Sequence, residues 1–211
     1  MNIGILGAGK VGATAAQLFV EVGHDVAIAN RSGPSSMDDL AENLPRLEPV
    51  TPERAVEFGE VVLLAIPFRE RESLPDAELF EGRIVIDAMN PYTEDFHVMD
   101  LGNDTSSELV AEQLPGARVV KAFNTMYWET LRDRGHSELP EEERFAVFVA
   151  GDDPEAKAIA SDLIRDIGFG PVDTGSLAEG GALQEPGSVF YHREISTAEA
   201  REKARQLSAS R

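Results

Sequence analysis

The sequence predicts an α/β fold with a doubly wound, mostly parallel sheet and a small C-terminal extension. Short apolar runs alternate with helical segments along most of the chain. These runs are continuously apolar, as in strands that helices cover on both faces. A glycine-rich turn follows the first run, at the position where such sheets bind ligands.

The first 30 residues read as strand, turn, helix and strand. Residues 2–6 and 25–29 are apolar, and residues 11–22 carry Ala, Leu, Phe and Val at helical spacing. Gly23 is expected to end this helix, because glycine readily adopts the left-handed conformation of a C-terminal cap.

The alternation continues along the chain. We expect further strands at Val50 and at residues 61–66, 83–87, 118–122, 146–150 and 171–173. We expect helices at residues 37–44, 52–58, 72–80, 106–113 and 154–167, with Asp152 or Asp153 capping the last of them. Residues 89–103 and 177–193 are expected to be loops, and residues 197–207 a charged helix. We therefore assign residues 1–176 to one nucleotide-binding domain and residues 177–211 to a C-terminal loop and short helix within the same compact unit.

Composition excludes several classes of partner. Asp and Glu number 38 against 19 Lys and Arg, which gives a formal net charge of −19. Such a surface repels nucleic-acid phosphates and anionic membranes, so neither is expected as a partner. There is no cysteine, and the four histidines show no metal-binding spacing, so no metal site is expected. No apolar run is long enough to span a bilayer and no signal peptide opens the chain, so we expect a cytoplasmic protein.

The turn Gly7-Ala8-Gly9-Lys10-Val11-Gly12 fits G-x-G-x-x-G. The first glycine allows a tight turn, the second lets the backbone approach a pyrophosphate, and the third lets helix and strand pack closely. The helix N-terminus then offers free N–H groups to the phosphates. A turn without a ligand is the alternative, but the strand–turn–helix context favours a Rossmann-type dinucleotide site.

The end of the second strand distinguishes NADP from NAD. An NAD site usually carries Asp or Glu there, to bind the ribose 2′-hydroxyl. This chain carries Asn30-Arg31-Ser32, without a carboxylate that would repel a 2′-phosphate. Arg31 can pair with that phosphate, while Asn30 and Ser32 can donate hydrogen bonds to it. We therefore predict NADP(H), with a solvated loop charge as the alternative reading of Arg31.

Further strand ends are expected to line the nicotinamide half of the cofactor. The predicted cofactor contacts there are Ala65, Ile66, Pro67, Asn90, Pro91, Ala122 and Asn124. The predicted substrate pocket consists of Phe68, Met89, Thr125 and Met126, with core filling as the alternative.

No side chain is assigned as catalytic. The sequence holds no G-x-S-x-G motif and no Ser-His-Asp arrangement near such a turn. Lys121 could be a general acid, but it lies inside a predicted strand and can instead point into a helix layer. Hydride transfer between two hydride carriers requires that their rings be held face to face, and it needs no acid or base from the protein.

The series of motifs resembles that of the NADP reductases that depend on coenzyme F420, a deazaflavin. The resemblance rests on the glycine turn and on Asn30-Arg31-Ser32, Ala65-Ile66-Pro67-Phe68, Asn90-Pro91, Ala122-Phe123-Asn124-Thr125, Gly151-Asp152-Asp153 and Asp173-Thr174-Gly175-Ser176-Leu177. It implies direct hydride transfer between the nicotinamide C4 and the deazaflavin C5, and often a homodimer. By this resemblance, NADP would be bound by Gly9, Lys10, Val11, Asn30, Arg31, Ser32, Ile66 and Pro67. Asn124, Thr125 and Met126 would lie next to the deazaflavin.

Other functions remain open beside this resemblance. The chain could be an NADPH-dependent reductase of a flavin or of a small carbonyl or imine substrate, or an NADP-binding redox sensor without turnover. A related reductase domain occurs in the membrane ferric reductases of the STEAP type. An open, ring-sized slot around Met89, Asn124 and Met126 would favour an enzyme, and a filled one a sensor. For an enzyme, the expected partner is a small-molecule redox cosubstrate.

Overall fold

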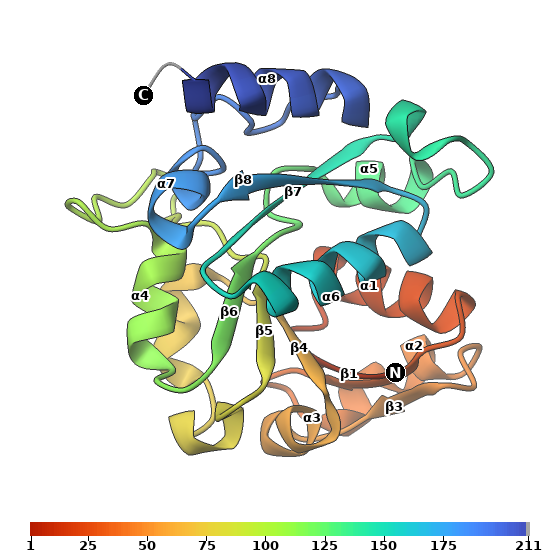
Figure 1. Cartoon of the computed structure of the whole chain (residues 1–211). Helices are drawn as coiled ribbons and strands as arrows, with labels where there is room; N and C mark the ends of the chain where they lie inside the picture. Colours follow the sequence, from red (N-terminus) through yellow and green to blue (C-terminus); the bar gives the residue numbers. More distant parts are fainter. Residues whose placement is uncertain (210–211) are drawn as a thin grey trace.

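One eight-stranded sheet runs through the computed structural model, which describes residues 1–209 (Figure 1). Its strand order is β3-β2-β1-β4-β5-β6-β7-β8. The strands are β1 (Asn2–Leu6), β2 (Asp25–Ala29), β3 (Leu47–Pro49), β4 (Val61–Leu64), β5 (Ile84–Asp87), β6 (Arg118–Lys121), β7 (Ala146–Gly151) and β8 (Gly170–Gly175). All neighbouring strands are parallel except β6 and β7. The predicted doubly wound, mostly parallel sheet is therefore confirmed.

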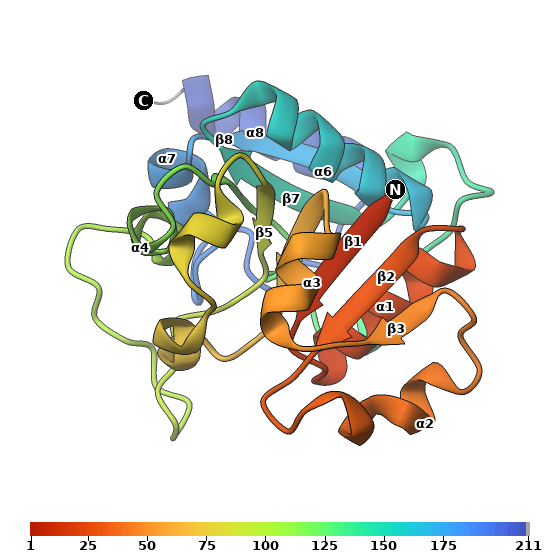
Figure 2. The same cartoon turned by 90° about the horizontal axis from the view of Figure 1, so that it is seen from below.

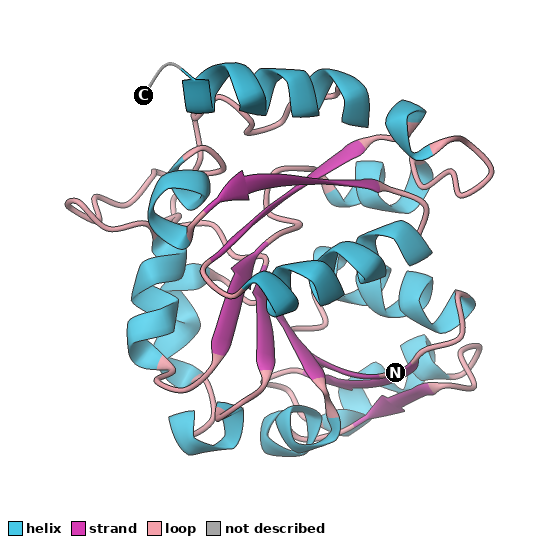
Figure 3. Ribbon diagram, in the orientation of Figure 1, coloured by secondary structure: helices cyan, strands magenta, loops and turns pink. Residues whose placement is uncertain are grey.

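Helices cover both faces of this sheet (Figure 3). The α-helices are α1 (Lys10–Glu21), α2 (Asp38–Ala41), α3 (Pro52–Phe58), α4 (Ser106–Gln113), α5 (Trp128–Asp133), α6 (Pro154–Asp166), α7 (Leu177–Ala182) and α8 (Thr197–Ala209). The 3-10 helices are η1 (Pro34–Met37), η2 (Phe68–Ser73), η3 (Ala77–Phe80) and η4 (Glu141–Glu143).

Several boundaries differ from the sequence prediction. The helix expected at residues 72–80 is two 3-10 helices, because Pro75 cannot donate a backbone hydrogen bond and keeps Leu74 extended (ψ 150°). The helix expected at residues 37–44 is reduced to η1 and the four-residue α2, and β3 precedes Val50. Helices α5 and α7 were not predicted; Ser176 is the N-cap of α7, and its side chain accepts from the Glu179 N–H.

Alternate residues of the central strands pack into two separate hydrophobic cores. Ile5 and Leu63 belong to the core that includes residues of α1 and α6, whereas Leu6 and Leu64 belong to the core that includes residues of α3 and α4. Figure 2 shows α3 lying across the face of β1. Burial on both faces explains why the strands read as continuous apolar runs.

The end of the chain packs on the β7–β8 side of the sheet. Phe190 stacks on Phe148 of β7 with ring centroids 4.2 Å apart, and Ala200 of α8 joins the same small core. Helix α8 lies along β8 at the top of Figure 1. The C-terminal segment is thus held by its own hydrophobic contacts.

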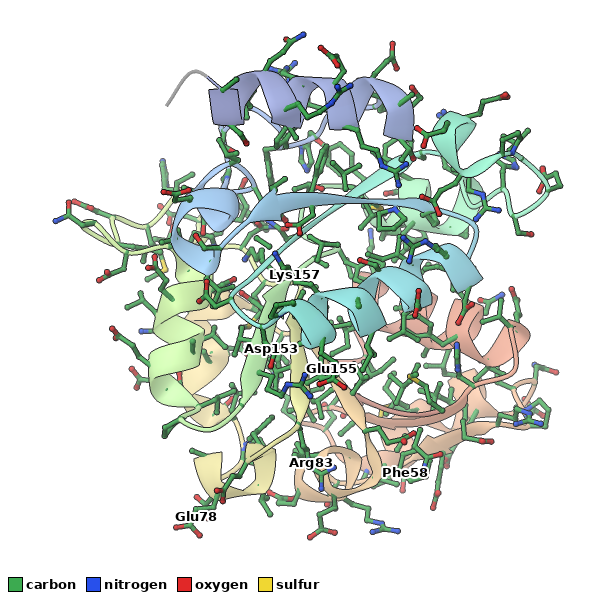
Figure 4. The ribbon with its side chains drawn as sticks, viewed as in Figure 1. Phe58, Glu78, Arg83, Asp153, Glu155 and Lys157 are labelled. Atoms are coloured by element: carbon green, nitrogen blue, oxygen red, sulfur yellow. The ribbon has the colours of Figure 1, made fainter. Side chains whose placement is uncertain are left out.

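Asp153 has a structural role at the start of α6, as its predicted capping position implies. Its carboxylate accepts from the N–H groups of Glu155 and Ala156. Arg118 of β6 donates to both of its oxygens, at 2.6 and 2.9 Å. These bonds hold the pKa of the Asp153 carboxyl well below its usual range. Figure 4 shows Asp153 and Glu155 together at this end of α6.

Candidate dinucleotide-binding site

A cleft of about 460 Å³ opens where β1, β2 and β4 end. Strand β1 lies between β2 and β4, so the chain builds the sheet to one side of β1 with β2 and β3 and to the other side with β4 and β5. Such a switch in strand order is where open α/β sheets bind ligands. The predicted residues that line this cleft are Gly7, Ala8, Gly9, Asn30, Arg31, Ser32, Ala65, Ile66 and Pro67.

The glycine turn is shaped to admit a phosphate. Gly7 has φ +114°, a conformation that favours glycine. A Cβ on Gly12 would overlap the Gly7 carbonyl oxygen, so the third glycine permits the close packing of helix on turn. At Gly9, by contrast, no described heavy atom lies within 4 Å of the place that a Cβ would occupy. Gly9 is therefore the point where a ligand can approach the backbone.

The start of α1 offers hydrogen-bond donors to this open space. Gly9 is the N-cap of α1, and no side chain of residues 1–209 caps the helix there. The first turn carries no acidic residue, so the positive end of the helix dipole is not neutralised locally. Lys10, the first helical residue, places its Nζ 5.1 Å above the ring of Trp128. The turn thus meets the requirements of a pyrophosphate site.

The loop after β2 presents Arg31 to the cleft. Asn30 organises this loop: its Oδ1 accepts from the Ser32 N–H at 2.8 Å, and its Nδ2 donates to Ser36 Oγ at 2.9 Å. The Asn30 side chain therefore shapes the loop rather than standing free for a ligand. The Arg31 side chain is 85% exposed, and its Nη1 lies 3.4 Å from Glu70 Oε1. Its guanidinium is accessible to a phosphate.

The opposite wall holds residues that the sequence prediction missed. Arg69 and Glu70 in η2, together with Pro52, Ser73, Leu74 and Pro75, complete the cleft. Arg69 Nη2 lies 3.8 Å from Glu70 Oε1. All of these residues except Pro52 follow the end of β4, so the sequence held a signal for them, but the predicted set stopped at Phe68.

The ends of β5 and β6 are joined by two amides. Asn90 Nδ2 donates to the Asn124 carbonyl at 2.9 Å, and Asn124 Nδ2 donates to Asn90 Oδ1 at 3.1 Å and to the Gln184 carbonyl at 2.9 Å. The Asn124 side chain is fixed by these bonds. Its Oδ1, however, has no hydrogen-bond partner among the described residues, and Asn124 is 2% exposed.

A buried carbonyl oxygen without a donor carries a desolvation cost that a ligand N–H would remove. The carboxamide of a nicotinamide supplies such an N–H. Together with the open glycine turn, this orphaned acceptor fits a nicotinamide dinucleotide.

The four residues of the predicted substrate pocket are buried. Phe68 and Met89 lie in the core beside α3 and α4, whereas Met126 lies in the core beside α1 and α6. Thr125 is 4% exposed, and its carbonyl accepts from the His192 N–H. None of these four residues lines the cleft after β1, β2 and β4. Phe123, which precedes Asn124, is buried and packs edge-on against Phe19.

A C-terminal segment, residues 184–192, covers this end of the site. Besides its bonds to Asn124 and Thr125, it places Tyr191 Oη 3.1 Å from Tyr92 Oη. His192 has φ +51° and stacks between Tyr127 and Tyr191, with ring centroids 4.0 Å from each. Burial raises the pKa of the Tyr191 hydroxyl, which therefore stays protonated while it accepts from the Tyr92 hydroxyl. The covering segment therefore closes over the predicted acceptor side.

Residues 2–91 match the family described as NADP oxidoreductase, coenzyme F420-dependent. A hypothetical protein of Sinorhizobium meliloti, SMa0349, superposes with a TM-score of 0.82 at 30% identity, over 93% of this chain and 95% of that one. A protein of Arthrobacter sp. FB24 that was proposed to be an F420-dependent NADP-reductase has a TM-score of 0.76 at 25% identity, over 93% of this chain and 99% of its own. The match to the coenzyme F420-dependent NADP oxidoreductase family thus covers residues 2–91, and the similarity to the two solved structures extends over most of the chain.

The chain is also similar to part of a larger protein. Metalloreductase STEAP3 of Rattus norvegicus is 34% identical over 180 residues, which make up 84% of this chain and 34% of that protein. The chain thus spans about a third of the length of the curated relatives that it matches. Within residues 1–209, no helix combines the length and the apolar character needed to cross a bilayer.

Lys121 has a structural role. Its Nζ donates to Met89 O at 2.7 Å, to Ser106 Oγ at 2.9 Å and to Asp87 Oδ2 at 3.1 Å. An ammonium has three donors, and all three are used. The side chain is fully buried, so a proton on it has no path to a substrate in this structure. The geometry therefore opposes the reading of Lys121 as a general acid.

Proposed function

We propose that the protein transfers a hydride between NADP(H) and a second redox cofactor, and that this cofactor is the deazaflavin F420. The proposal is carried by one arrangement at three strand ends: an open glycine turn after β1, an exposed arginine after β2 and a buried unpartnered carbonyl after β6. The family match favours F420 over other acceptors.

Each of these groups has a separate task in binding. The N–H groups of the first turn of α1 bind the pyrophosphate at Gly9. Arg31 binds the 2′-phosphate through charge-assisted hydrogen bonds. Asn124 Oδ1 accepts a hydrogen bond from the carboxamide, and this bond fixes which face of the nicotinamide meets the acceptor. Bound NADPH supplies the hydride from its own ring, so the protein contributes orientation and exclusion of water.

The covering segment controls access for the acceptor. It contacts Asn124 and Thr125 through single backbone hydrogen bonds, and His192 is exposed. Phe190 is fully buried and Glu185 Oε1 accepts from Ser106, so only the end of the segment at His192 needs to move to free space for a planar ring. The acceptor is therefore a small molecule that enters between residues 124–126 and the covering segment, in a protein that we place in the cytoplasm.

An acceptor panel tests the proposal. NADPH oxidation is followed anaerobically with oxidised F420, FMN, FAD, a ferric chelate and small carbonyl or imine compounds, at low and high salt. Turnover with F420 alone supports the proposal. Turnover only with another acceptor supports a different reductase, and tight NADPH binding without turnover on any acceptor supports a redox sensor. Gly9→Val, which should fold without binding NADPH, is the background control.

A further inference from the structure

Glu70 faces the proposed 2′-phosphate position from the far wall of the cleft. Arg31 follows β2 and Glu70 follows β4, and both line the cleft. Glu70 Oε1 lies 3.4 Å from Arg31 Nη1 and 3.8 Å from Arg69 Nη2. A single carboxylate oxygen therefore faces both guanidinium groups that line the cleft.

The ion pair between Arg31 and Glu70 is weak enough to be exchanged. The Arg31 side chain is 85% exposed, that of Glu70 is 30% exposed, and the separation exceeds a normal charge-assisted hydrogen bond. Exposed pairs of this kind contribute little to stability. A phosphate dianion, with more charge and three acceptor oxygens, can replace the carboxylate on Arg31.

Glu70 is free to turn while its surroundings stay in place. It lies in η2, a six-residue 3-10 helix, whose hydrogen bonds are poorer than those of an α-helix. This helix is anchored on both sides of Glu70: Phe68 is fully buried, and the Arg71 carbonyl accepts from Gln113 Nε2 at 2.7 Å. Movement of the Glu70 side chain therefore does not require the wall to unfold.

We infer that Glu70 is an internal anion that pairs with Arg31 in the empty site and reduces the preference of the site for NADP over NAD. This inference rests on the proposed NADP site. When NADP binds, the 2′-phosphate must displace Glu70 from Arg31 and remain near its negative charge. NAD lacks this phosphate, so Glu70 keeps its place and can accept a hydrogen bond from the ribose 2′-hydroxyl. Glu70 thus narrows the preference for NADP that Arg31 creates.

The test compares the Kd values of NADP⁺ and NAD⁺ for the wild type, Glu70→Gln, Arg31→Ala and the double variant. We expect Glu70→Gln to tighten NADP⁺ about three- to tenfold, because a like charge is removed near the phosphate. NAD⁺ affinity should stay level or fall. In the Arg31→Ala background, the gain for NADP⁺ should shrink, because Arg31 no longer has to be released. Glu72→Gln is the matched control, since it makes the same charge change in η2 outside the cleft lining.

Two results would overturn the inference and can be told apart. If Arg31→Ala selectively weakens NADP⁺ while Glu70→Gln leaves the NADP⁺/NAD⁺ ratio at the wild-type or Glu72→Gln value, the site stands and the role of Glu70 is refuted. If Arg31→Ala weakens both nucleotides equally, the 2′-phosphate site itself is wrong, and the inference falls with it.

Discussion

Lys121 Nζ lies 3.1 Å from Asp87 Oδ2, with both side chains fully buried where β5 and β6 end. Ser107 Oγ of α4 also donates to this carboxylate, at 2.6 Å, and Asp87 Oδ1 accepts from the Met89 N–H. The pair thus holds two strand ends and the start of a helix together beneath the nicotinamide side of the site. Charges this deeply buried are tolerated only with complete pairing.

Removal of the ammonium should destabilise the fold without abolishing the chemistry. Lys121→Met leaves Asp87 buried without its counter-ion and should lower the free energy of unfolding by about 3–5 kcal/mol, measured by urea denaturation. Lys121→Met/Asp87→Asn should recover part of the loss. NADPH oxidation per folded molecule, assayed at low temperature, should stay within a few-fold of wild type. A stable Lys121→Met variant without activity would instead make Lys121 catalytic.

The second and third glycines of the turn should respond differently to a side chain. Gly9→Val projects into open space at φ −74°, so the melting temperature should hold while NADPH binding is lost. Gly12→Ala forces a Cβ onto the Gly7 carbonyl and should lower the melting temperature. Calorimetry and NADPH titration on both variants separate these effects. NADPH binding by Gly9→Val at wild-type affinity would refute the phosphate turn.

Arg31 should discriminate between the two nucleotides. Arg31→Ala removes a charge-assisted bond to the 2′-phosphate and should weaken NADP⁺ binding by about 1–3 kcal/mol, or roughly five- to 150-fold. NAD⁺ binding should change far less. Arg54→Ala makes the same charge change on α3 outside the cleft lining and should leave both affinities level.

His24 should make stability depend on pH below neutrality. Burial lowers its pKa; its Nδ1 lies 3.2 Å from the Met1 amine and its Nε2 3.2 Å from Asp166, with Asp25 the other charge nearby. The unfolded chain therefore binds this proton more readily than the folded one. The contribution of neutral His24 to the free energy of unfolding should be complete above about pH 6.5 and should fall as the pH drops toward the pKa of His24 in the folded protein.

Thermal melts between about pH 7.5 and 5 test this contribution. His24→Gln should flatten the decline relative to wild type over that range. Partial burial of the ring between Tyr127 and Tyr191 lowers the pKa of His192 as well, so the stability curve of the double variant His24→Gln/His192→Gln should be flatter still. Parallel curves for all three proteins would contradict the assignment.

Much of the nucleotide half could be predicted from the sequence because its determinants are local. The glycine turn, Asn30 and Arg31 directly follow apolar runs, and parallel strands bring their ends to one edge. Glu70 was not predicted as a site residue, because its role depends on pairing with Arg31, which lies 39 residues earlier and on the other side of β1. Only the strand order places these two side chains on facing walls.

The acceptor side was less predictable for a different physical reason. Asn124 was singled out at a strand end, but its orphaned Oδ1 depends on how Asn90 and the Gln184 carbonyl occupy its amide. The covering segment has no hydrophobic period to reveal its position. Backbone hydrogen bonds and ring stacking hold it there, and these leave little trace in a sequence.

The two sides of the site are built from different parts of the chain and tolerate sequence change differently. The proposed phosphate site depends on the backbone geometry of the glycine turn. A side chain added there would collide with the turn at Gly12 or block the ligand at Gly9. The opposite side is closed by a stretch more than a hundred residues later that touches the strand ends at a few points. Insertions, deletions or substitutions in that stretch can reshape what meets the nicotinamide without disturbing the glycine turn and Arg31, which are proposed to hold the phosphates. Such an architecture lets evolution exchange electron acceptors while one reductant is kept.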